Sequence, residues 1–186
     1  MKLTVCICTI SGREDSLKRL VKKLTTQAEG KDVQVLWLGD NRRWTLGKKR
    51  MMMYFIANDS QYISFVDDDD DVSEDYIDTL LDAIDNNSGV DLINFKMQYE
   101  DRATIMPVYF SSRYENQNFV GHYERQSHTL MCWRWGVLSG KCYPDVTLFE
   151  DAYFAAEAAK RVTSEVSINK TLYYYKFDRE NSTQPK

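Results

Sequence analysis

The chain has 186 residues, of which 43% are hydrophobic and 28% charged, a composition typical of a folded globular protein rather than a disordered or fibrous one. A chain of this length buries a core without needing disulfides. Its four cysteines lack the paired spacing of a zinc site, so we expect reduced thiols. The formal net charge is -4, and the five consecutive aspartates Asp67 to Asp71 account for more than all of it. The acidity is therefore local.

Apolar runs along the chain are all shorter than the roughly 18 residues that a membrane-spanning helix requires. The N-terminal apolar stretch is short and flanked by charge, unlike a signal peptide. The sequence therefore predicts a cytoplasmic protein that is neither exported nor anchored in a membrane.

The first third of the chain alternates strand and helix patterns. The apolar, β-branched segment 3–9 predicts a strand buried on both faces. Leu17, Leu20, Val21 and Leu24 recur at helical spacing and predict an amphipathic helix over about 15–27. A second buried strand is predicted over 33–38, with Trp37 in the core.

The same alternation continues through the middle of the chain. The apolar patterns predict a helix over 46–57, a strand over 62–66 and a helix with Ser73 as its N-cap that ends near 86–89. Two further strands, over 91–99 and 104–110, form a predicted hairpin around Glu100, Asp101 and Arg102.

The last third of the chain has weaker patterns. Residues 111–126 are polar without a clear period and predict a loop, while 130–138 are apolar and rich in tryptophan. A helix is predicted over 149–161, and two short strands over 164–177 on either side of Asn169 and Lys170. The whole pattern predicts one α/β domain over 1–186, with a mostly parallel sheet and helices on both faces.

The aspartate run is the strongest functional signal. Adjacent carboxylates repel each other by about 1 kcal/mol or more at 4 Å even in water, so something should compensate them. A solvated helix start explains Glu74 and Asp75, because acidic residues favour helix N-termini. It explains Asp67 and Asp68 poorly, because they directly follow a strand, at the sheet edge where α/β proteins bind ligands. Hard oxygen ligands at that edge favour a Mg²⁺ or Mn²⁺ site.

Two other interpretations of the run can be tested on the sequence. A calcium-binding EF-hand loop requires Gly and Glu at its sixth and twelfth positions, where this chain has Val72 and Asp78, so the EF-hand is excluded. A phosphatase with an aspartyl nucleophile also has Asp-x-Asp after an apolar strand, and this alternative stays open. So does a non-catalytic module that binds nucleotides or cations.

Four segments together resemble the family 2 glycosyltransferases with the GT-A fold, a Rossmann-like nucleotide-diphospho-sugar transferase domain. They span residues 1 to about 160, and the tail with Arg179, Asn181 and Ser182 is similar but less diagnostic. The segments are Thr9-Ile10-Ser11-Gly12-Arg13, Gly39-Asp40 with Gly47-Lys48-Lys49-Arg50, Tyr62 to Asp71 as the fxDxDD element, and Phe149-Glu150-Asp151 as the ED element.

The resemblance implies a donor site for a nucleotide-diphosphate sugar, in the first instance a UDP-sugar, with Mn²⁺ or Mg²⁺ as the cofactor. Residues 1–100 are the expected nucleotide-sugar-binding half and 101–186 the acceptor-side half. Asp67 and Asp69 match the metal-binding positions, although the run of five leaves the register open. The residues that match donor-binding positions are Thr9, Arg13, Asp40, Lys49, Arg50, Asp67 and Asp68. An ordinary turn role for Asp40, and helix capping or solvation for Lys49 and Arg50, are the alternatives.

The resemblance also implies an inverting transfer with Asp151 as the general base. A carboxylate takes the proton of the acceptor hydroxyl as its oxygen attacks the sugar. Glu150 either shares this role or faces solvent at a helix start. A bound metal stabilises the charge that develops on the leaving diphosphate.

The acceptor is the least defined part of the prediction. His128 and Trp133 are candidate acceptor-side residues, with core packing as the alternative for the tryptophan. Residues 41–50 hold five basic side chains and Trp44, a combination suited to phosphates and a stacked base. Small soluble members of the family are familiar from bacteriophages, where some glycosylate hydroxymethylated pyrimidines in DNA within the host cytoplasm. That acceptor is one expectation, and a saccharide or glycolipid is the alternative.

Overall fold

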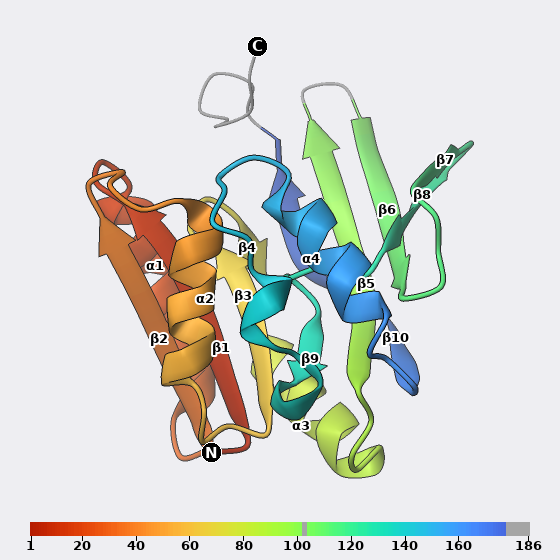
Figure 1. The fold of residues 1–186 in the computed structure, drawn as a ribbon, viewed down its shortest axis with the longest axis horizontal. Coiled ribbons are helices and arrows are strands. Elements are labelled where there is room, and N and C mark those ends of the chain that lie inside the picture. The colour runs from red at the N-terminus through yellow and green to blue at the C-terminus, as the bar shows by residue number, and fades with distance from the viewer. Residues whose placement is uncertain (102–103, 178–186) are drawn as a thin grey trace.

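The computed structural model describes residues 1–101 and 104–177, which form one mixed sheet with helices packed on it (Figure 1). Arg102 in the predicted hairpin turn and Arg179, Asn181 and Ser182 in the tail lie outside the described residues. The strands are β1 (Leu3–Ile10), β2 (Val33–Asp40), β3 (Tyr62–Asp67), β4 (Asp71–Val72), β5 (Leu92–Asp101), β6 (Thr104–Ser111), β7 (Gln117–Phe119), β8 (His122–Gln126), β9 (Cys132–Arg134) and β10 (Glu165–Lys176). The α-helices are α1 (Glu14–Ala28), α2 (Leu46–Ile56), α3 (Tyr76–Asn86) and α4 (Glu150–Ala159), with short 3₁₀ turns at Trp135–Val137 and Gly140–Cys142.

The N-terminal half confirms the predicted βαβ pattern. Strand β1 is buried along almost its whole length because it pairs in parallel with β2 on one side and with β3 on the other. Its apolar residues therefore face a helix on either side of the sheet, as a continuous apolar strand requires. The parallel pairing brings the ends of β1 and β3 to one edge, where Cys8 is in register with Asp67.

The other half of the sheet departs from the prediction of a mostly parallel sheet. Strand β9 lies between β3 and β5 and is antiparallel to both, and β5 forms an antiparallel hairpin with β6. Strands β10 and β8 pair in parallel with β5 and β6, so the sheet is mixed. The bounds of β5 and β6 account for part of this, because strands that are two residues apart in the sequence can pair only in the antiparallel sense.

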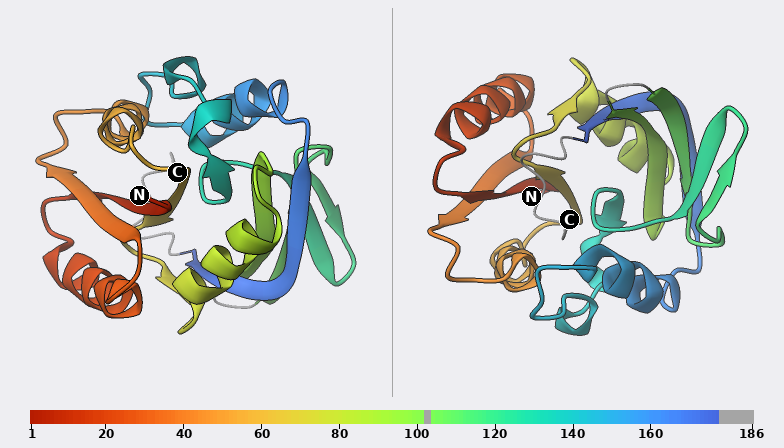
Figure 2. Two further views of the ribbon diagram at one scale, coloured as in Figure 1. Left: turned by 90° about the horizontal axis from the view of Figure 1, so that it is seen from below. Right: turned by 90° about the horizontal axis from the view of Figure 1, so that it is seen from above.

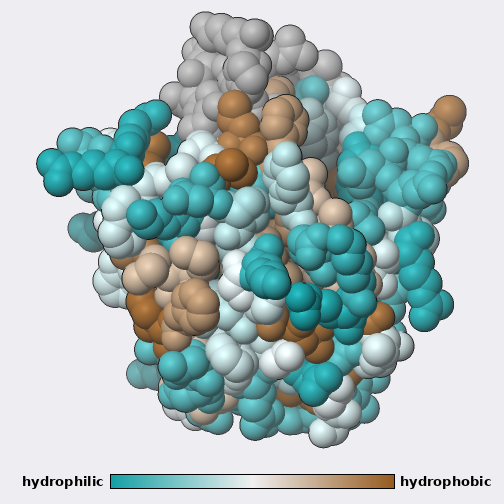
Figure 3. Space-filling view, viewed as in Figure 1, coloured by the Kyte–Doolittle hydropathy of each residue, from teal (hydrophilic) through white to brown (hydrophobic). Residues whose placement is uncertain are grey.

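Helices cover both faces of the sheet, as expected. Helices α1 and α3 lie on one face and α2 and α4 on the other (Figure 2). Figure 3 shows the face with α2 and α4, where brown apolar atoms gather beside the loop before α4. Leu148 and Phe149 in this loop are exposed. None of the helices in the described part of the chain combines the length and apolar character needed to cross a bilayer.

Several local predictions are wrong. Residues 111–126 are not a loop, because β7 and β8 form a hairpin there around Gly121, whose φ of 89° suits glycine. Residues 164–177 hold one strand, β10, with irregular register near Thr171 rather than two strands. Ser73 does not cap α3, which begins at Tyr76 with Asp75 in the capping position.

Trp37 is 51% exposed and does not lie in the core. It belongs to β2, an edge strand of the sheet whose only neighbour among the described strands is β1. An edge strand has less of its surface covered than a central one, so an apolar strand pattern overestimates the burial of its side chains.

Gly47 fixes the start of α2 against the loop that leads to α4. Its backbone N–H donates to Val146 O at 3.0 Å, and a Cβ at this position would lie 1.8 Å from Pro144 O. Because backbone atoms cannot move aside cheaply, we expect Gly47→Ala to lower the free energy of unfolding by about 2 kcal/mol or more. Gly136→Ala is the matched control, because nothing lies within 4 Å of its added methyl. Urea denaturation compares both variants, and equal losses would contradict the contact.

Candidate active site

A cleft of about 650 Å³ lies where the ends of β1 and β3 meet the start of α4 and one face of β5, β6 and β8. Asp67, Asp69 and Asp151 all line it, although they come from different elements. The predicted residues Thr9, Arg13, Lys49, Arg50, Asp68, His128 and Glu150 line it as well. Asp40 and Trp133 are absent from the lining that the described residues form.

The five aspartates each have a partner within the protein. Arg50 forms an ion pair with Asp67, and Lys23 forms one with Asp71. Thr9 donates to Asp68, and Arg13 pairs with both Asp68 and Asp69. Asp70 accepts hydrogen bonds from the Tyr173 hydroxyl and the Lys176 N–H. Compensation of the repulsion therefore does not by itself require a metal ion. The compensation is incomplete, because burial and the charge of Asp67 raise the pKa of Asp69 and raise that of Asp70 to about 8.

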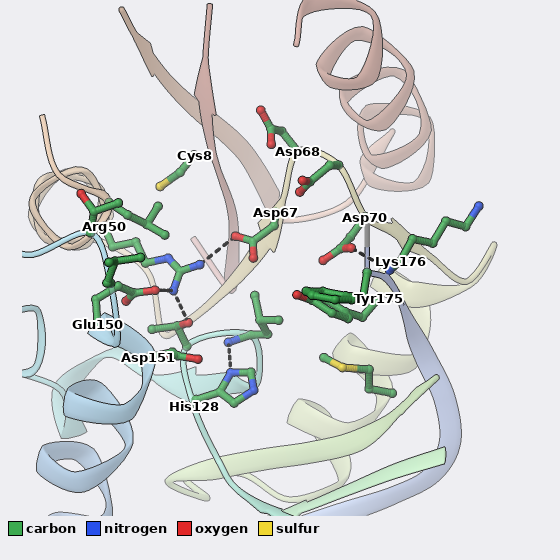
Figure 4. Close-up of a pocket in the computed structure, with 18 of the residues that line it drawn as sticks. Cys8, Arg50, Asp67, Asp68, Asp70, His128, Glu150, Asp151, Tyr175 and Lys176 are labelled. Atoms are coloured by element: carbon green, nitrogen blue, oxygen red, sulfur yellow. Dashed lines mark hydrogen bonds and ion pairs between the residues drawn. The ribbon is translucent and has the colours of Figure 1, made fainter. Parts of the chain in front are cut away.

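Arg50 is buried and joins the two sides of the cleft (Figure 4). Its guanidinium donates to Asp67 Oδ1 at 2.7 Å and to Glu150 Oε1 at 2.5 Å. It also donates to Thr129 Oγ1 at 2.5 Å, and it lies 5.7 Å from the centre of the Phe65 ring. Arg50 was predicted to bind the donor, but the structure gives its charge to two carboxylates of the protein.

The predicted catalytic pair divides into a buried and an exposed carboxylate. Glu150 is 4% exposed, and its Oε2 has no hydrogen-bond partner within the described chain. Burial raises the pKa of Glu150 to about 7, against the opposing charge of Arg50. Asp151 is exposed at the first turn of α4, where its Oδ1 accepts the Ala152 N–H at 2.8 Å. Of the two, only Asp151 is accessible to an incoming hydroxyl group.

The predicted nucleotide-facing residues of the first loop are held by one aspartate. Thr9 Oγ1 donates to Asp68 Oδ2 at 2.6 Å, and Arg13 reaches Asp68 Oδ1 at 2.6 Å and Asp69 Oδ2 at 2.9 Å. Asp68 is 2% exposed, so its carboxylate ties the loop after β1 to the aspartate run.

Lys49 and Asp40 form a second internal tie. Lys49 is buried and donates to Thr9 O at 2.8 Å and to Asp40 Oδ1 at 2.9 Å. Asp40 Oδ2 accepts the N–H groups of Arg43 and Trp44, both at 2.7 Å. Burial raises the pKa of Asp40, but Lys49 and the two amides outweigh it and lower the pKa. Asp40 thus organises the turn after β2, the alternative role that the sequence left open for it.

Two of the aspartates at the cleft offer the kind of oxygen ligand that a hard divalent cation takes when it also binds a substrate. Asp67 and Asp69 each engage one carboxylate oxygen with an arginine and have a second oxygen for another ligand. Mg²⁺ commonly binds through one or two carboxylates plus substrate phosphates. Within residues 1–101 and 104–177, no three His, Cys, Asp or Glu side chains are arranged to hold a metal.

The two acceptor-side candidates differ in accessibility. His128 lies at the cleft, packs edge-on against Phe110 and is half-buried. Burial and the charge of Arg50 lower its pKa to about 4, so its imidazole is neutral at pH 7. Trp133 is 1% exposed, packs against Phe154 and donates its indole N–H to His128 O. It supports the histidine from the core, and its role at the acceptor side stays a prediction.

Sequence reasoning missed several residues that line the cleft. Tyr123 and Arg125 lie on β8, inside the segment predicted as a loop, and Tyr99 lies on β5. The glycine at 121 between two short polar runs was the available signal for a hairpin. Phe149 is 70% exposed at the cleft with a φ of 59°, a strained value for a bulky residue that no sequence pattern reveals.

The α/β fold with a mixed sheet matches that of the GT-A domain of TarS. The S. aureus TarS 1–349 crystal structure superposes with a TM-score of 0.68 at 17% sequence identity, covering 95% of this chain and 60% of that one. The TarS 1–349 complexes with UDP and with UDP-GlcNAc give the same TM-score and identity, covering 97% and 96% of this chain and 62% and 59% of theirs. The chain spans about three fifths of the TarS segment. No model of a known protein family matches the chain, and no curated protein does.

Arg50 provides a test of the cleft's internal electrostatics. We expect Arg50→Met to lower the free energy of unfolding by about 3–5 kcal/mol, because Asp67 and Glu150 lose a buried counter-charge. Adding Glu150→Gln should recover part of the loss. Arg161→Met, on an exposed arginine, is the control and should change stability by less than about 0.5 kcal/mol. Additive losses in the double variant would contradict the pairing.

Glu150 also predicts a pH dependence of stability. The folded protein holds the Glu150 proton up to a pKa of about 7, whereas the ordinary value is 4.5. Between these two pH values the folded state therefore binds more protons at Glu150 than the unfolded state does. The contribution of Glu150 to the free energy of unfolding falls as the pH rises from 4.5 to 7. The unfolding free energy of the wild type minus that of Glu150→Gln should fall by about 3 kcal/mol over this range. Urea denaturation at several pH values measures it, and a constant difference would contradict the shift.

Proposed function

We propose that this chain is a metal-dependent glycosyltransferase that moves a sugar from a UDP-sugar to an acceptor hydroxyl with inversion. The observation that carries the proposal is the meeting of Asp67, Asp69 and Asp151 at one cleft. Asp67 ends β3, Asp69 lies in the turn after it, and Asp151 lies in the first turn of α4. The UDP and UDP-GlcNAc complexes of TarS, which shares the fold, support UDP as the nucleotide of the donor.

The donor side belongs to residues 1–100, and 101–186 are the acceptor side. In this proposal Asp67 and Asp69 would hold Mn²⁺ or Mg²⁺, whose positive charge would offset the negative charge of the departing diphosphate. Arg13 lies at the same end of the cleft and bridges Asp68 and Asp69. Its guanidinium thereby fixes the loop after β1 beside the carboxylates at the donor end of the cleft.

The proton transfer belongs to Asp151. Its exposed carboxylate at the start of α4 accepts the proton of the acceptor hydroxyl while the oxygen of that hydroxyl attacks the anomeric carbon. Glu150 is a positioning residue, because Arg50 holds it and almost no surface of it is exposed. The bond between Glu150 and Arg50 fixes the first turn of α4 and therefore the place of Asp151.

Two aspartate variants distinguish donor binding, assigned to Asp69, from proton transfer, assigned to Asp151. We expect UDP with Mn²⁺ to raise the melting temperature of the wild type and of Asp151→Asn, but not of Asp69→Asn, which loses a metal ligand. Transfer from UDP-GlcNAc should fall by about 10²–10⁴-fold in Asp151→Asn, the size of a general-base contribution. Asp82→Asn, an exposed aspartate on α3, is the matched control and should behave as wild type.

Different results would favour the other functions. Release of phosphate from a simple phosphate ester, without a nucleotide, would indicate the aspartyl phosphatase. A UDP shift without turnover of any UDP-sugar would indicate a binding module. The absence of any shift with UDP and Mn²⁺ would overturn the proposal.

A further inference from the structure

The wall of the cleft opposite the metal-binding aspartates is one face of the antiparallel half of the sheet. Every second residue along three of its strands lines the cleft, as expected when alternate side chains share a face. These residues are Met97, Tyr99 and Asp101 on β5, Val108 and Phe110 on β6, and Tyr123 and Arg125 on β8. A sheet face of this kind is normally covered by a helix or by a ligand.

Strand pairing brings the aromatic rings of this wall together. Tyr175 on β10 is in register with Tyr99 on β5, and their rings stack at 5.8 Å with 19° between the planes. Phe177 stacks on the same tyrosine at 6.3 Å, and Tyr123 meets it edge-on at 5.9 Å. We call Tyr99, Tyr123, Tyr175 and Phe177 the aromatic wall.

The aromatic wall is only half-buried, unlike the floor beneath it. Met97, Val108 and Phe110 are at most 5% exposed, whereas the four rings keep part of their surface at the cleft. The ring of Tyr175 points toward Asp67 in Figure 4, so the wall begins beside the proposed donor site. Flat apolar rings that carry hydroxyl groups match a sugar, which has an apolar C–H face and a polar rim.

Charge at the cleft disfavours a polyanion as the occupant. Arg13, Lys49 and Arg50 are all ion-paired with carboxylates of the protein. Lys49 and Arg50 are also buried, so the basic segment 41–50 offers fewer cations to a phosphate backbone than its sequence indicates. Arg125 donates to Gln117 O, Glu124 O and Asn118 Oδ1, and its guanidinium lies 5.0 Å from the Tyr123 ring centre.

We infer that the aromatic wall is the acceptor subsite and that it takes a neutral saccharide rather than a base of DNA. This inference rests on the proposed function, because the wall is called an acceptor subsite only if a sugar donor occupies the other end of the cleft. The sugar stacks on the wall, with the reacting hydroxyl group directed toward Asp151.

The test measures saccharide binding on the enzyme saturated with UDP and Mg²⁺. Saturation-transfer NMR with the neutral disaccharides maltose, cellobiose and lactose should show transfer from protein to sugar. Tyr123→Ala should weaken binding of the saccharide by about tenfold, and Tyr123→Phe, which keeps the ring, should bind within about threefold of wild type. Tyr109→Ala is the matched control: it lies on β6 between two cleft residues but on the other face, with Lys96 5.0 Å from its ring centre.

The results of this test distinguish a failure of the saccharide subsite from a failure of the proposed glycosyltransferase function. If UDP and Mg²⁺ raise the melting temperature but none of the disaccharides binds, the inference fails and the proposed function stands. Equal effects of Tyr123→Ala and Tyr109→Ala, or preferential binding of a hydroxymethylcytosine oligonucleotide that depends on Tyr123, would also overturn the inference. Loss of the UDP shift in the wild type would instead overturn the proposed function, and with it the assignment of the acceptor.

Discussion

The buried guanidinium of Arg50 is the contact on which the cleft depends. It joins Asp67 at the end of β3 to Glu150 at the start of α4, two carboxylates on opposite sides of the cleft. Glu150 lies 100 residues after Arg50 in the sequence. The metal side and the base side of the proposed reaction are therefore fixed relative to each other by one charge. Such a buried pair adds little net stability, but removing either partner leaves an uncompensated charge. We infer that the main effect of the Arg50–Glu150 pair is to fix the position of the neighbouring Asp151.

The aspartate run shows how a protein tolerates a repulsive sequence. Donors from β1, the loop after it, α1, α2 and β10 hold the five carboxylates, and Arg13 serves both Asp68 and Asp69. Repulsion alone therefore does not prove a metal site. What favours a cation is narrower: Asp67 and Asp69 line the cleft, and burial together with the negative charge of Asp67 raises the pKa of Asp69 against the opposing charge of Arg13. A diphosphate would bring further negative charge to the same place, which a divalent ion offsets.

Local patterns predicted the βαβ half of the fold and the edge at which the aspartates lie, because buried parallel strands and amphipathic helices leave strong periodic signals. They failed where a structure depends on distant partners. Strand β9 has three residues, and its place between β3 and β5 follows from pairing rather than from its own sequence. Burial of Arg50 was equally hidden, since an arginine among basic neighbours resembles a solvated or phosphate-binding residue. The exposure of Trp37 reflects the edge position of β2, which only the strand order reveals.

The hairpin of β7 and β8 has a consequence for how this fold diversifies. It sits at the outer end of the sheet, and within residues 1–101 and 104–177 it pairs with the rest of the sheet only through β6. Tyr123 and Arg125 nevertheless reach the cleft from it, while Val120 at its tip is fully exposed. Mutations or insertions in this hairpin would remodel one wall without touching Arg50 or the aspartates. If the cleft transfers a sugar as proposed, such changes would alter the choice of acceptor and leave the donor side of the cleft in place.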